Sequence, residues 1–254
     1  MTTLEGTPNP EAPNPQLPIV QKLRIRYAKR GRLRFTSHRD FARAFERAVR
    51  RAGIPIGFSS GFTPHPKISY ANASPTGAAS EAEYLEIGMT RRCEPDDVRA
   101  SLDAALPDGL DIVDVVEAKP GSLADRLEAS SWEIALPGVS PEHAQSAVDA
   151  FLATDEVLIE RMMKRGLRTL DCRDAVLALS ARSDDTRTGP CAILAVVVRH
   201  DTPSIRPDDV LAGLRSSGGL ELEQTPIATR LAQGPLDTET GTVGDPFAFD
   251  RDAS

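Results

Sequence analysis

The fold of this 254-residue chain is decided by residues 19–53, which read IVQKLRIRYAKRGRLRFTSHRDFARAFERAVRRAG. From Ile19 to Tyr27, apolar and basic residues alternate, and this period of two predicts a half-buried β-strand. Ser37 predicts the start of a helix, because its hydroxyl can accept from the amide three residues on, with Asp40 as the acid of a capping box. At about 100° per residue, the apolar residues of this helix fall on one side and four arginines on the other. Gly53 ends the helix.

The patterns downstream repeat this strand and helix rhythm. In the first part of the chain they predict a helix over 94–106 and strands over 67–71, 82–89 and 110–118. In the second part they predict helices over 140–153 and from 206, and strands over 131–136, 156–163, 175–181, 191–199 and 220–228. This order predicts an α+β fold of two tandem ferredoxin-like (βαββαβ) units with antiparallel sheets, the second unit carrying an extra hairpin.

The domain boundaries follow from composition. Residues 1–18 contain five prolines, and residues 233–254 are rich in Gly, Thr and Asp, so neither end offers much to bury. We expect a disordered leader over 1–18 and a disordered acidic tail over 233–254. The two units then span 19–120 and 121–232.

Charge is distributed very unevenly along the chain. Residues 20–67 hold 13 Lys or Arg and two acidic residues, a net charge of +11, whereas the whole chain carries −7 and the remainder therefore −18. The same stretch holds six of the 12 aromatic residues. Basic side chains interleaved with rings are suited to phosphates and stacked bases, so RNA is the first partner to consider.

The candidate nucleic-acid-binding residues come from the strand, the turn, the helix and a Pro-bracketed loop. They are Arg24, Arg26, Lys29, Arg30, Arg32, Arg34, Arg39, Arg43, Arg47, Arg50, His65 and Lys67. The helix stripe within this set could be an ordinary solvated face. Such faces usually mix signs, whereas Glu46 is its only nearby acid, so we favour a functional interpretation.

Two histidines are the candidate catalytic residues. His38 stands at the predicted helix start, and His65 lies between Pro64 and Pro66, which restrict the backbone on both sides. Two imidazoles near a phosphodiester could act as general acid and general base without a metal. The alternative is that His65 belongs to a structured turn and caps a neighbouring carbonyl, and the sequence does not show whether the two histidines meet.

The sequence lacks the motifs that mark several other classes of function. Cys93, Cys172 and Cys191 have no short spacing, and the four histidines form no ligand pattern, so no metal site is predicted. Phosphate-binding loops, dinucleotide fingerprints and nucleophile elbows are missing. Neither an apolar run of about 18 residues nor a signal peptide is present, and we expect a cytoplasmic protein that does not bind membranes.

Several segments carry a family resemblance. They are LRFTSHRD (33–40), FERA (45–48), RAGIP (51–55), SGFTPHPKI (60–68), EYLE (83–86) and RPDDV (206–210). Together they resemble the radical-SAM-associated bacterial domain of unknown function, here in standalone form. The resemblance implies a radical-SAM protein as a partner in trans and a role in RNA or ribosome metabolism. Because the chain has no CxxxCxxC, the iron-sulfur cluster and S-adenosylmethionine are expected only in that partner, with no cofactor on this chain.

Three hypotheses remain open at this point. The leading one is an RNA-binding accessory protein that presents tRNA or rRNA to a radical-SAM enzyme. The second is a metal-independent endoribonuclease of the tandem ferredoxin-like kind, using His38 and His65. The third is a protein-interaction scaffold whose basic face binds an acidic partner.

Overall fold

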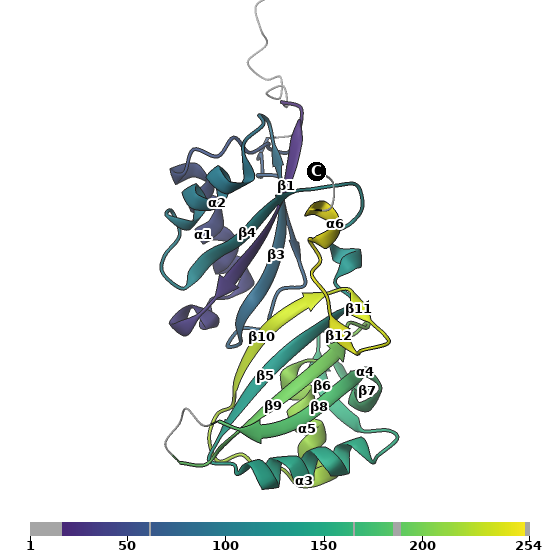
Figure 1. The fold of residues 1–254 in the computed structure, drawn as a ribbon. Helices are drawn as coiled ribbons and strands as arrows, with labels where there is room; N and C mark the ends of the chain where they lie inside the picture. Colours follow the sequence, from purple (N-terminus) through teal and green to yellow (C-terminus); the bar gives the residue numbers. More distant parts are fainter. Residues whose placement is uncertain (1–16, 61, 165, 185–188, 252–254) are drawn as a thin grey trace, which may run out of the picture.

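The computed structural model describes residues 17–60, 62–164, 166–184 and 189–251. The chain forms two halves and a C-terminal segment (Figure 1). The first half holds, in chain order, β1 (Gln21–Lys29), the 3-10 helix η1 (Gly31–Phe35), α1 (His38–Arg51), β2 (Ile68–Ala71), β3 (Ala79–Met89), α2 (Pro95–Asp103) and β4 (Leu110–Glu117). The second half holds η2 (Ala124–Arg126), β5 (Ala129–Pro137), α3 (Pro141–Leu152), β6 (Leu158–Met163), β7 (Gly166–Asp171), α4 (Cys172–Ala175), β8 (Val176–Ser183), β9 (Cys191–Arg199), α5 (Pro207–Gly218) and β10 (Ile227–Gly234). The C-terminal segment holds β11 (Leu236–Asp237), β12 (Thr242–Val243) and α6 (Ala248–Arg251).

One eight-stranded sheet runs through both halves. Its strand order is β4-β1-β3-β10-β5-β9-β8, and β2 pairs with β3 outside this path. All pairings are antiparallel except the short contact of β10 with β3, where Thr229 lies opposite Ala79 and Arg230 opposite Ser80. The two halves are therefore joined by one short parallel contact in the middle of the sheet. The predicted α+β class with a mostly antiparallel sheet is confirmed.

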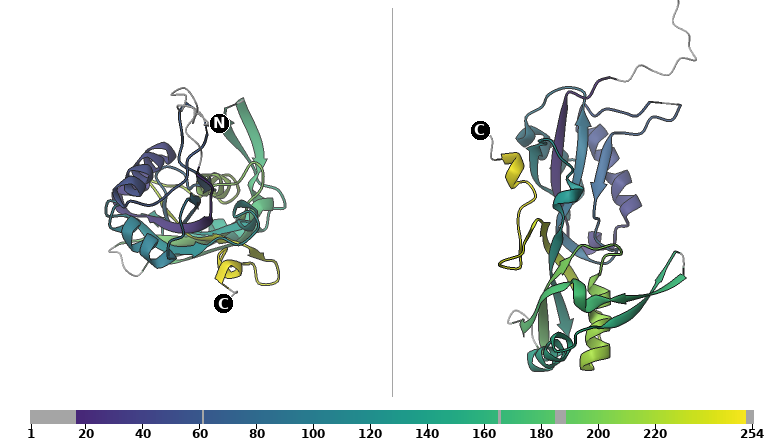
Figure 2. Two further views of the ribbon diagram at one scale, coloured as in Figure 1. Left: turned by 90° about the horizontal axis from the view of Figure 1, so that it is seen from above. Right: turned by 90° about the vertical axis from the view of Figure 1, so that its right-hand side faces the viewer.

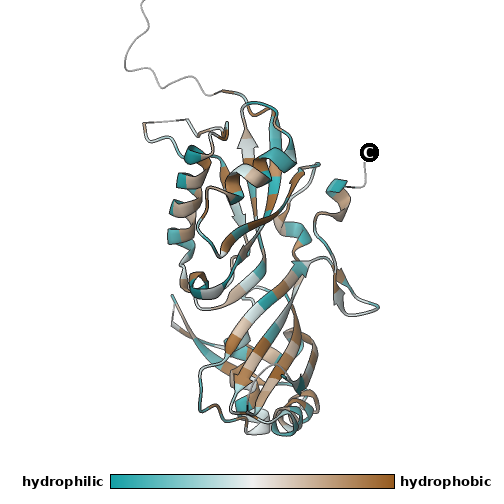
Figure 3. Ribbon diagram, turned by 60° about the vertical axis from the view of Figure 1, so that its left-hand side comes forward, coloured by the Kyte–Doolittle hydropathy of each residue, from teal (hydrophilic) through white to brown (hydrophobic). Residues whose placement is uncertain are grey.

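The helix α1 packs on the sheet as its sequence predicts. The Ser37 hydroxyl accepts from the Asp40 amide at 3.1 Å and caps the helix. Phe41 and Phe45 are buried, and the Phe41 ring stacks on that of Tyr27 from β1 with 4.1 Å between centroids. Hydrophilic and hydrophobic residues alternate along the α1 ribbon (Figure 3). Seen from the side, α1 and α5 lie on one face of the sheet and α6 on the other (Figure 2).

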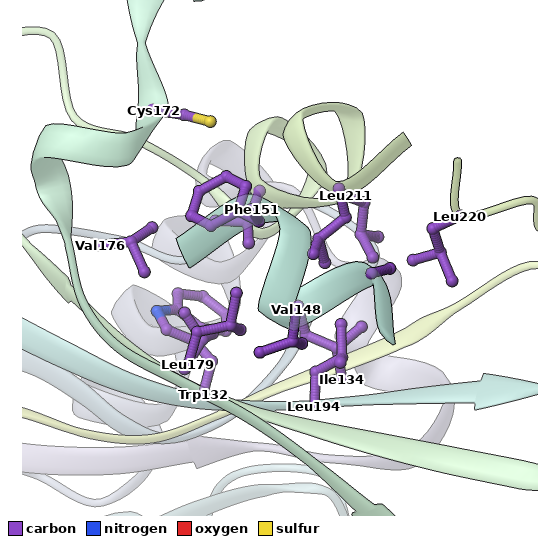
Figure 4. Close-up of a cluster of buried hydrophobic side chains, with 14 of the residues drawn as sticks. Trp132, Ile134, Val148, Phe151, Cys172, Val176, Leu179, Leu194, Leu211 and Leu220 are labelled. Atoms are coloured by element: carbon purple, nitrogen blue, oxygen red, sulfur yellow. The ribbon is translucent and has the colours of Figure 1, made fainter. Parts of the chain in front are cut away.

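The second half has its own core between its strands and the helices α3 and α5. Figure 4 shows Phe151 and Val148 pointing at Trp132, Ile134 and Leu194. The helices α3 and α5 approach so closely at Gly218 that a Cβ added there would lie 2.5 Å from the Ala147 Cα. Glycine is the residue that permits this approach.

The extra segment of the second half is the hairpin β6–β7. It forms a separate two-stranded sheet, with Leu158 opposite Asp171 and Met163 opposite Gly166. The hairpin projects from the body on the same side of the large sheet as α1 and α5 (Figure 2). Arg161 in β6 forms an ion pair with Asp209 of α5, which ties the base of the hairpin to that helix.

The last strand of the sheet lies later than predicted. The sequence pattern suggests a strand over 220–228, whereas β10 runs from Ile227 to Gly234. Leu220 is fully buried and belongs to the core of the second half, but it precedes the strand. The apolar residue needed for burial at this position therefore suggested a strand where no sheet pairing occurs.

The C-terminal segment corrects a second expectation. A disordered tail was expected from Gln233, yet the segment up to Arg251 forms β11, β12 and α6, of which β12 contacts β5 and β10 in the second half and α6 contacts β4 in the first. Phe247 is fully buried, with its ring centroid 5.2 Å from that of Tyr84, and Asp250 forms an ion pair with Arg24. The segment is short of apolar residues, but these two side chains fit partners distant in sequence. The expected leader lies outside the described residues except for Leu17 and Pro18, which are exposed.

Candidate functional site

The outer face of α1 carries the arginine stripe predicted from the sequence. Arg39, Arg43, Arg47 and Arg50 are all exposed. Within the described part of the chain, none of the four forms an ion pair, and Glu46 on the same helix is only partly exposed. Like charges on one helix face repel each other, so this surface is electrostatically suited to a polyanion.

The basic residues of β1 lie in a different environment. Arg24 is 1% exposed and binds Asp250 at 2.8 Å and Glu86 at 3.2 Å. Lys29 is also buried and donates to the Pro75 carbonyl at 3.4 Å. Burial lowers the pKa of Lys29 from its ordinary value. Arg24 and Lys29 were predicted to bind nucleic acid from the surface, and their burial removes them from it.

Arg26 is partly exposed and Arg30 is exposed, and both are paired. The Arg26 Nε donates to the Glu81 carbonyl at 2.8 Å, and Arg30 forms ion pairs with the carboxylates of Glu81 and Asp111. The basic residues of β1 and the turn are therefore largely paired, some with carboxylates and some with backbone carbonyls from other parts of the chain.

The 3-10 helix adds an exposed ring to the basic surface. Arg32 is exposed, and the Arg34 guanidinium lies 4.5 Å from the centroid of the Phe35 ring, which is 59% exposed. A guanidinium over an aromatic ring is a cation-π arrangement. Arg34 and Phe35 also line a cavity together with Pro207 and Asp208 of the second half.

The Pro-bracketed loop is held as a small hairpin. The Ser59 amide donates to the His65 carbonyl at 2.8 Å, and the His65 amide donates to the Ser59 hydroxyl at 2.9 Å. Phe62 near its tip is 98% exposed. His65 and Lys67 line a cavity of about 440 Å³ together with Lys22 and Glu86.

The two candidate catalytic histidines line different cavities. His38 stands at the first position of α1, with its ring edge-on to that of Tyr70 at 4.8 Å, and it lines a cleft between the two halves. His65 lines the separate cavity beside Glu86. Across the described residues, no contact joins the two imidazoles. The fold gives no support to a shared acid and base at these positions.

The cleft between the halves is a site that the sequence did not reveal. It has a volume of about 800 Å³, and polar groups from both halves line it, among them His38, Asn72, Ser74, Trp132, His200 and Arg230. Arg230 is 3% exposed, donates to the buried Glu83 at 2.6 Å and lies 5.0 Å from the Trp132 ring centroid. The sequence pattern placed the last strand over 220–228, so Arg230 fell outside it and gave no signal of a site.

His200 forms part of the wall of this cleft. Its Nδ1 lies 2.7 Å from the Leu127 carbonyl and its Nε2 lies 3.0 Å from the Ser130 hydroxyl. Burial, aided by the charge of Arg230, lowers the pKa of His200 from its ordinary value. The imidazole is therefore neutral at pH 7 and fixed by a partner at each ring nitrogen.

The described ranges contain no evident site for metal binding or thiol chemistry. Those residues contain no group of three or more His, Cys, Asp or Glu that could hold a metal ion. Cys93, Cys172 and Cys191 are free, and burial raises the pKa of the Cys172 thiol to about 12. None of the helices in the described ranges is long and apolar enough to cross a membrane.

The fold and surface define a mixed α+β protein with an exposed basic helix beside an interdomain cleft. The chain belongs to the family described as "Uncharacterized protein conserved in bacteria (DUF2344)", whose model matches residues 22–207. No curated protein matches the chain. The match ends before β10 and α6, so Arg230 and Asp250 lie beyond it.

Solved structures show only a weak likeness. An unknown protein from Galdieria sulphuraria is 11% identical with a TM-score of 0.23, over 83% of this chain and 98% of that one. DyPB from Rhodococcus jostii RHA1 is 12% identical with a TM-score of 0.20, over 88% and 95%. The encapsulated DyP-type peroxidase from Mycobacterium smegmatis is 12% identical with a TM-score of 0.21, over 88% and 94%. Likenesses at these TM-scores carry no inference about this chain.

Proposed function

We propose that this protein is an RNA-binding accessory protein that works with a radical-SAM enzyme in RNA modification or ribosome metabolism. The observation that carries the RNA-binding part is the exposed arginine stripe of α1, which has no ion-pair partner among the described residues. Holding four like charges on one face costs stability unless a polyanion relieves the repulsion. Two exposed rings of the first half, Phe35 and Phe62, offer stacking partners for unpaired bases.

The strand order within each half supports the interpretation of the chain as a pair of ferredoxin-like units. In the first half the strand order is β4-β1-β3-β2, and in the second half it is β10-β5-β9-β8. In both, the first strand lies between the fourth and the third, and two helices cover one face. We infer that the two halves are tandem copies of one βαββαβ plan, with β6–β7 inserted into the second.

The radical-SAM part rests on the resemblance of the sequence segments around α1 and the Pro-bracketed loop. Its test is co-expression with a radical-SAM protein of the same bacterium, followed by size-exclusion chromatography. A complex is expected to elute earlier than either protein alone. Separate elution of the two proteins would remove the partner from the proposal while leaving RNA binding untouched.

The RNA-binding part predicts a salt-dependent affinity. With four phosphate contacts from the α1 stripe, log K for RNA should fall as log salt rises, with a slope of about three in magnitude. Arg43→Glu with Arg47→Glu should weaken binding over all RNA sequences and flatten the slope, because phosphate contacts position RNA without reading its bases. Both side chains point away from the core, so the fold should persist.

The measurement is fluorescence anisotropy of labelled tRNA and rRNA fragments over a range of salt concentrations. Arg91→Glu with Arg215→Glu is the matched control, because it changes net charge equally at two exposed arginines outside α1. Loss of binding in the α1 variant alone supports the proposal. Absence of binding at about 0.15 M salt, or equal loss in both variants, would mean that the basic face serves a protein partner or none.

A further inference from the structure

The cleft between the halves has the features of a ligand site and is not explained by the α1 stripe. Its volume of about 800 Å³ lies within the range of small-molecule pockets. Its walls come from both halves, so the site exists only when the halves are joined. It lies where β10 meets β3, on the side of the sheet that carries Trp132 and the second core.

Two buried polar atoms of residues that line this cleft have no hydrogen-bond partner among the described residues. Arg230 uses its terminal nitrogens on the Asn72 carbonyl at 2.9 Å and on Glu83, but its buried Nε finds no acceptor among the described residues. The buried hydroxyl of Ser74, on the same wall, also has no partner there. A buried donor without an acceptor is unfavourable, so these groups favour a ligand that brings acceptor oxygens.

The electrostatics of the cleft favour an anion. Two long helices begin at its edge, since His38 is the first residue of α1 and Pro207 the first of α5, and both line the cleft. Helix N-termini carry partial positive charge and attract phosphate groups. Arg230 on the wall and the buried cation Lys29 behind it face one buried carboxylate, Glu83. Two acids, Asp201 and Asp208, lie on the outer wall, and Asp201 is bound by Arg199 at 3.1 Å.

From these contacts we infer that the cleft binds a nucleoside phosphate, with the phosphate beside Arg230 and Ser74 and the nucleoside among the hydroxyl, amide and imidazole groups of the walls. The cleft is larger than a phosphate needs and is lined by neutral polar side chains such as Asn72 and His200, which suit a base and a sugar. The ligand can be a free nucleotide or the 5′-phosphorylated end of an RNA. The second source rests on the proposed function, because His38 connects the α1 surface to the cleft.

The experiment uses the full chain and isothermal titration calorimetry. The probes are AMP and UMP, and an RNA octamer with a 5′-phosphate or a 5′-hydroxyl. Ala73→Trp is the blocking variant, because Ala73 lines the cleft and is exposed, so a larger side chain fills the cleft without entering the core. Ala104→Trp is the matched control, placed at an exposed alanine at the end of α2 that does not line the cleft.

A second variant tests the phosphate contact itself. Arg230→Gln combined with Glu83→Gln removes both members of the ion pair and leaves the net charge of the buried group, which includes Lys29, unchanged. We expect saturable binding by the wild-type protein, weakened at least about tenfold by Ala73→Trp and by the double variant, and unchanged by Ala104→Trp.

The outcomes separate the ligand sources from each other and from the proposed function. Binding of AMP or UMP identifies a free nucleotide, whereas binding of only the 5′-phosphorylated octamer identifies an RNA end. Either result stands even if the α1 reversal leaves tRNA affinity unchanged. The inference is overturned if no probe binds at millimolar concentration, if neither nucleotide binds and the octamers bind equally with and without the phosphate, or if Ala73→Trp leaves the affinity of the bound probe unaltered.

Discussion

Asp250 in the C-terminal segment should be one of the most important single carboxylates for the stability of the first half. Its side chain is fully buried and accepts from the Arg24 guanidinium at 2.8 and 2.9 Å, from Arg126 at 2.7 Å and from the Lys119 amide at 3.0 Å. Arg24 lies beneath it on β1 with 1% exposure. The change Asp250→Ala therefore removes the main counter-charge from a buried cation.

The cost can be estimated from these contacts. Breaking a buried ion pair by removing one partner costs about 3–5 kcal/mol, because the other charge stays buried. Arg24 keeps Glu86 at 3.2 Å and the Gly121 carbonyl, so we expect the lower end, about 3 kcal/mol. For a domain of this size each kcal/mol shifts Tm by roughly 2–4 °C, which gives a fall of about 6–12 °C.

Thermal unfolding followed by circular dichroism measures the effect. Glu239→Ala is the control, since it removes one exposed carboxylate from the same segment and should leave Tm unchanged. Arg24→Met in the Asp250→Ala background should recover part of the loss, because no charge then remains buried at this place. A Tm for Asp250→Ala within about 2 °C of wild type would refute the reasoning and restore the interpretation of this segment as an unattached tail.

The effect of Asp250→Ala should also depend on pH. Burial opposes ionisation of Asp250, but hydrogen bonds from the Lys119 amide, Arg24 and Arg126 outweigh it and hold the pKa of Asp250 below its ordinary value. A depressed carboxyl pKa contributes stability that is present above about pH 4 and is lost as pH falls through the folded-state pKa. The difference between wild type and Asp250→Ala should therefore shrink below about pH 4 and should not widen there.

Three further outcomes follow from particular contacts. His200 should titrate below its ordinary pKa in NMR spectra. Because the unfolded chain then binds more protons than the folded one, stability should fall as pH drops below about 6.5, and His200→Gln should flatten that dependence. Titration of His200 at or above about 6.5 would contradict this prediction. Gly218→Ala should cost about 1–3 kcal/mol in urea unfolding, because its Cβ would lie 2.5 Å from the Ala147 Cα, and a neutral result would mean that α3 and α5 separate easily. Phe62→Ala should leave Tm unchanged but weaken single-stranded RNA binding by about 1–3 kcal/mol in anisotropy titrations, and unchanged affinity would exclude base stacking by this ring.

The elements that the sequence predicted best are those whose signals are local. The strand Gln21–Lys29 and the helix His38–Arg51 agree with the predicted alternation and capping, because side-chain period and cap chemistry act within a few residues. The last strand was displaced because Leu220 is buried without being paired in the sheet. Apolar pattern reports burial, and burial is not the same as sheet pairing.

In the candidate site, too, the features that depend on local sequence could be predicted and those that depend on distant residues could not. The exposure of Arg39, Arg43, Arg47 and Arg50 could be predicted, since the helical period alone places them opposite Phe41 and Phe45. The burial of Arg24 and Lys29 could not, because it depends on Asp250 and Pro75, which come from distant parts of the chain.

The sequence by itself thus determined the helix-and-strand order of the first half and the basic face of α1, both of which depend on neighbours along the chain. Only the tertiary structure decided which basic residues stay free, that Asp250 of the C-terminal segment pairs with Arg24 of β1, and that Arg230 and His200 line one cleft. The physical reason is that a charge is exposed or neutralised according to what packs against it. In this fold those partners lie as many as 226 positions away in the sequence, as with Arg24 and Asp250.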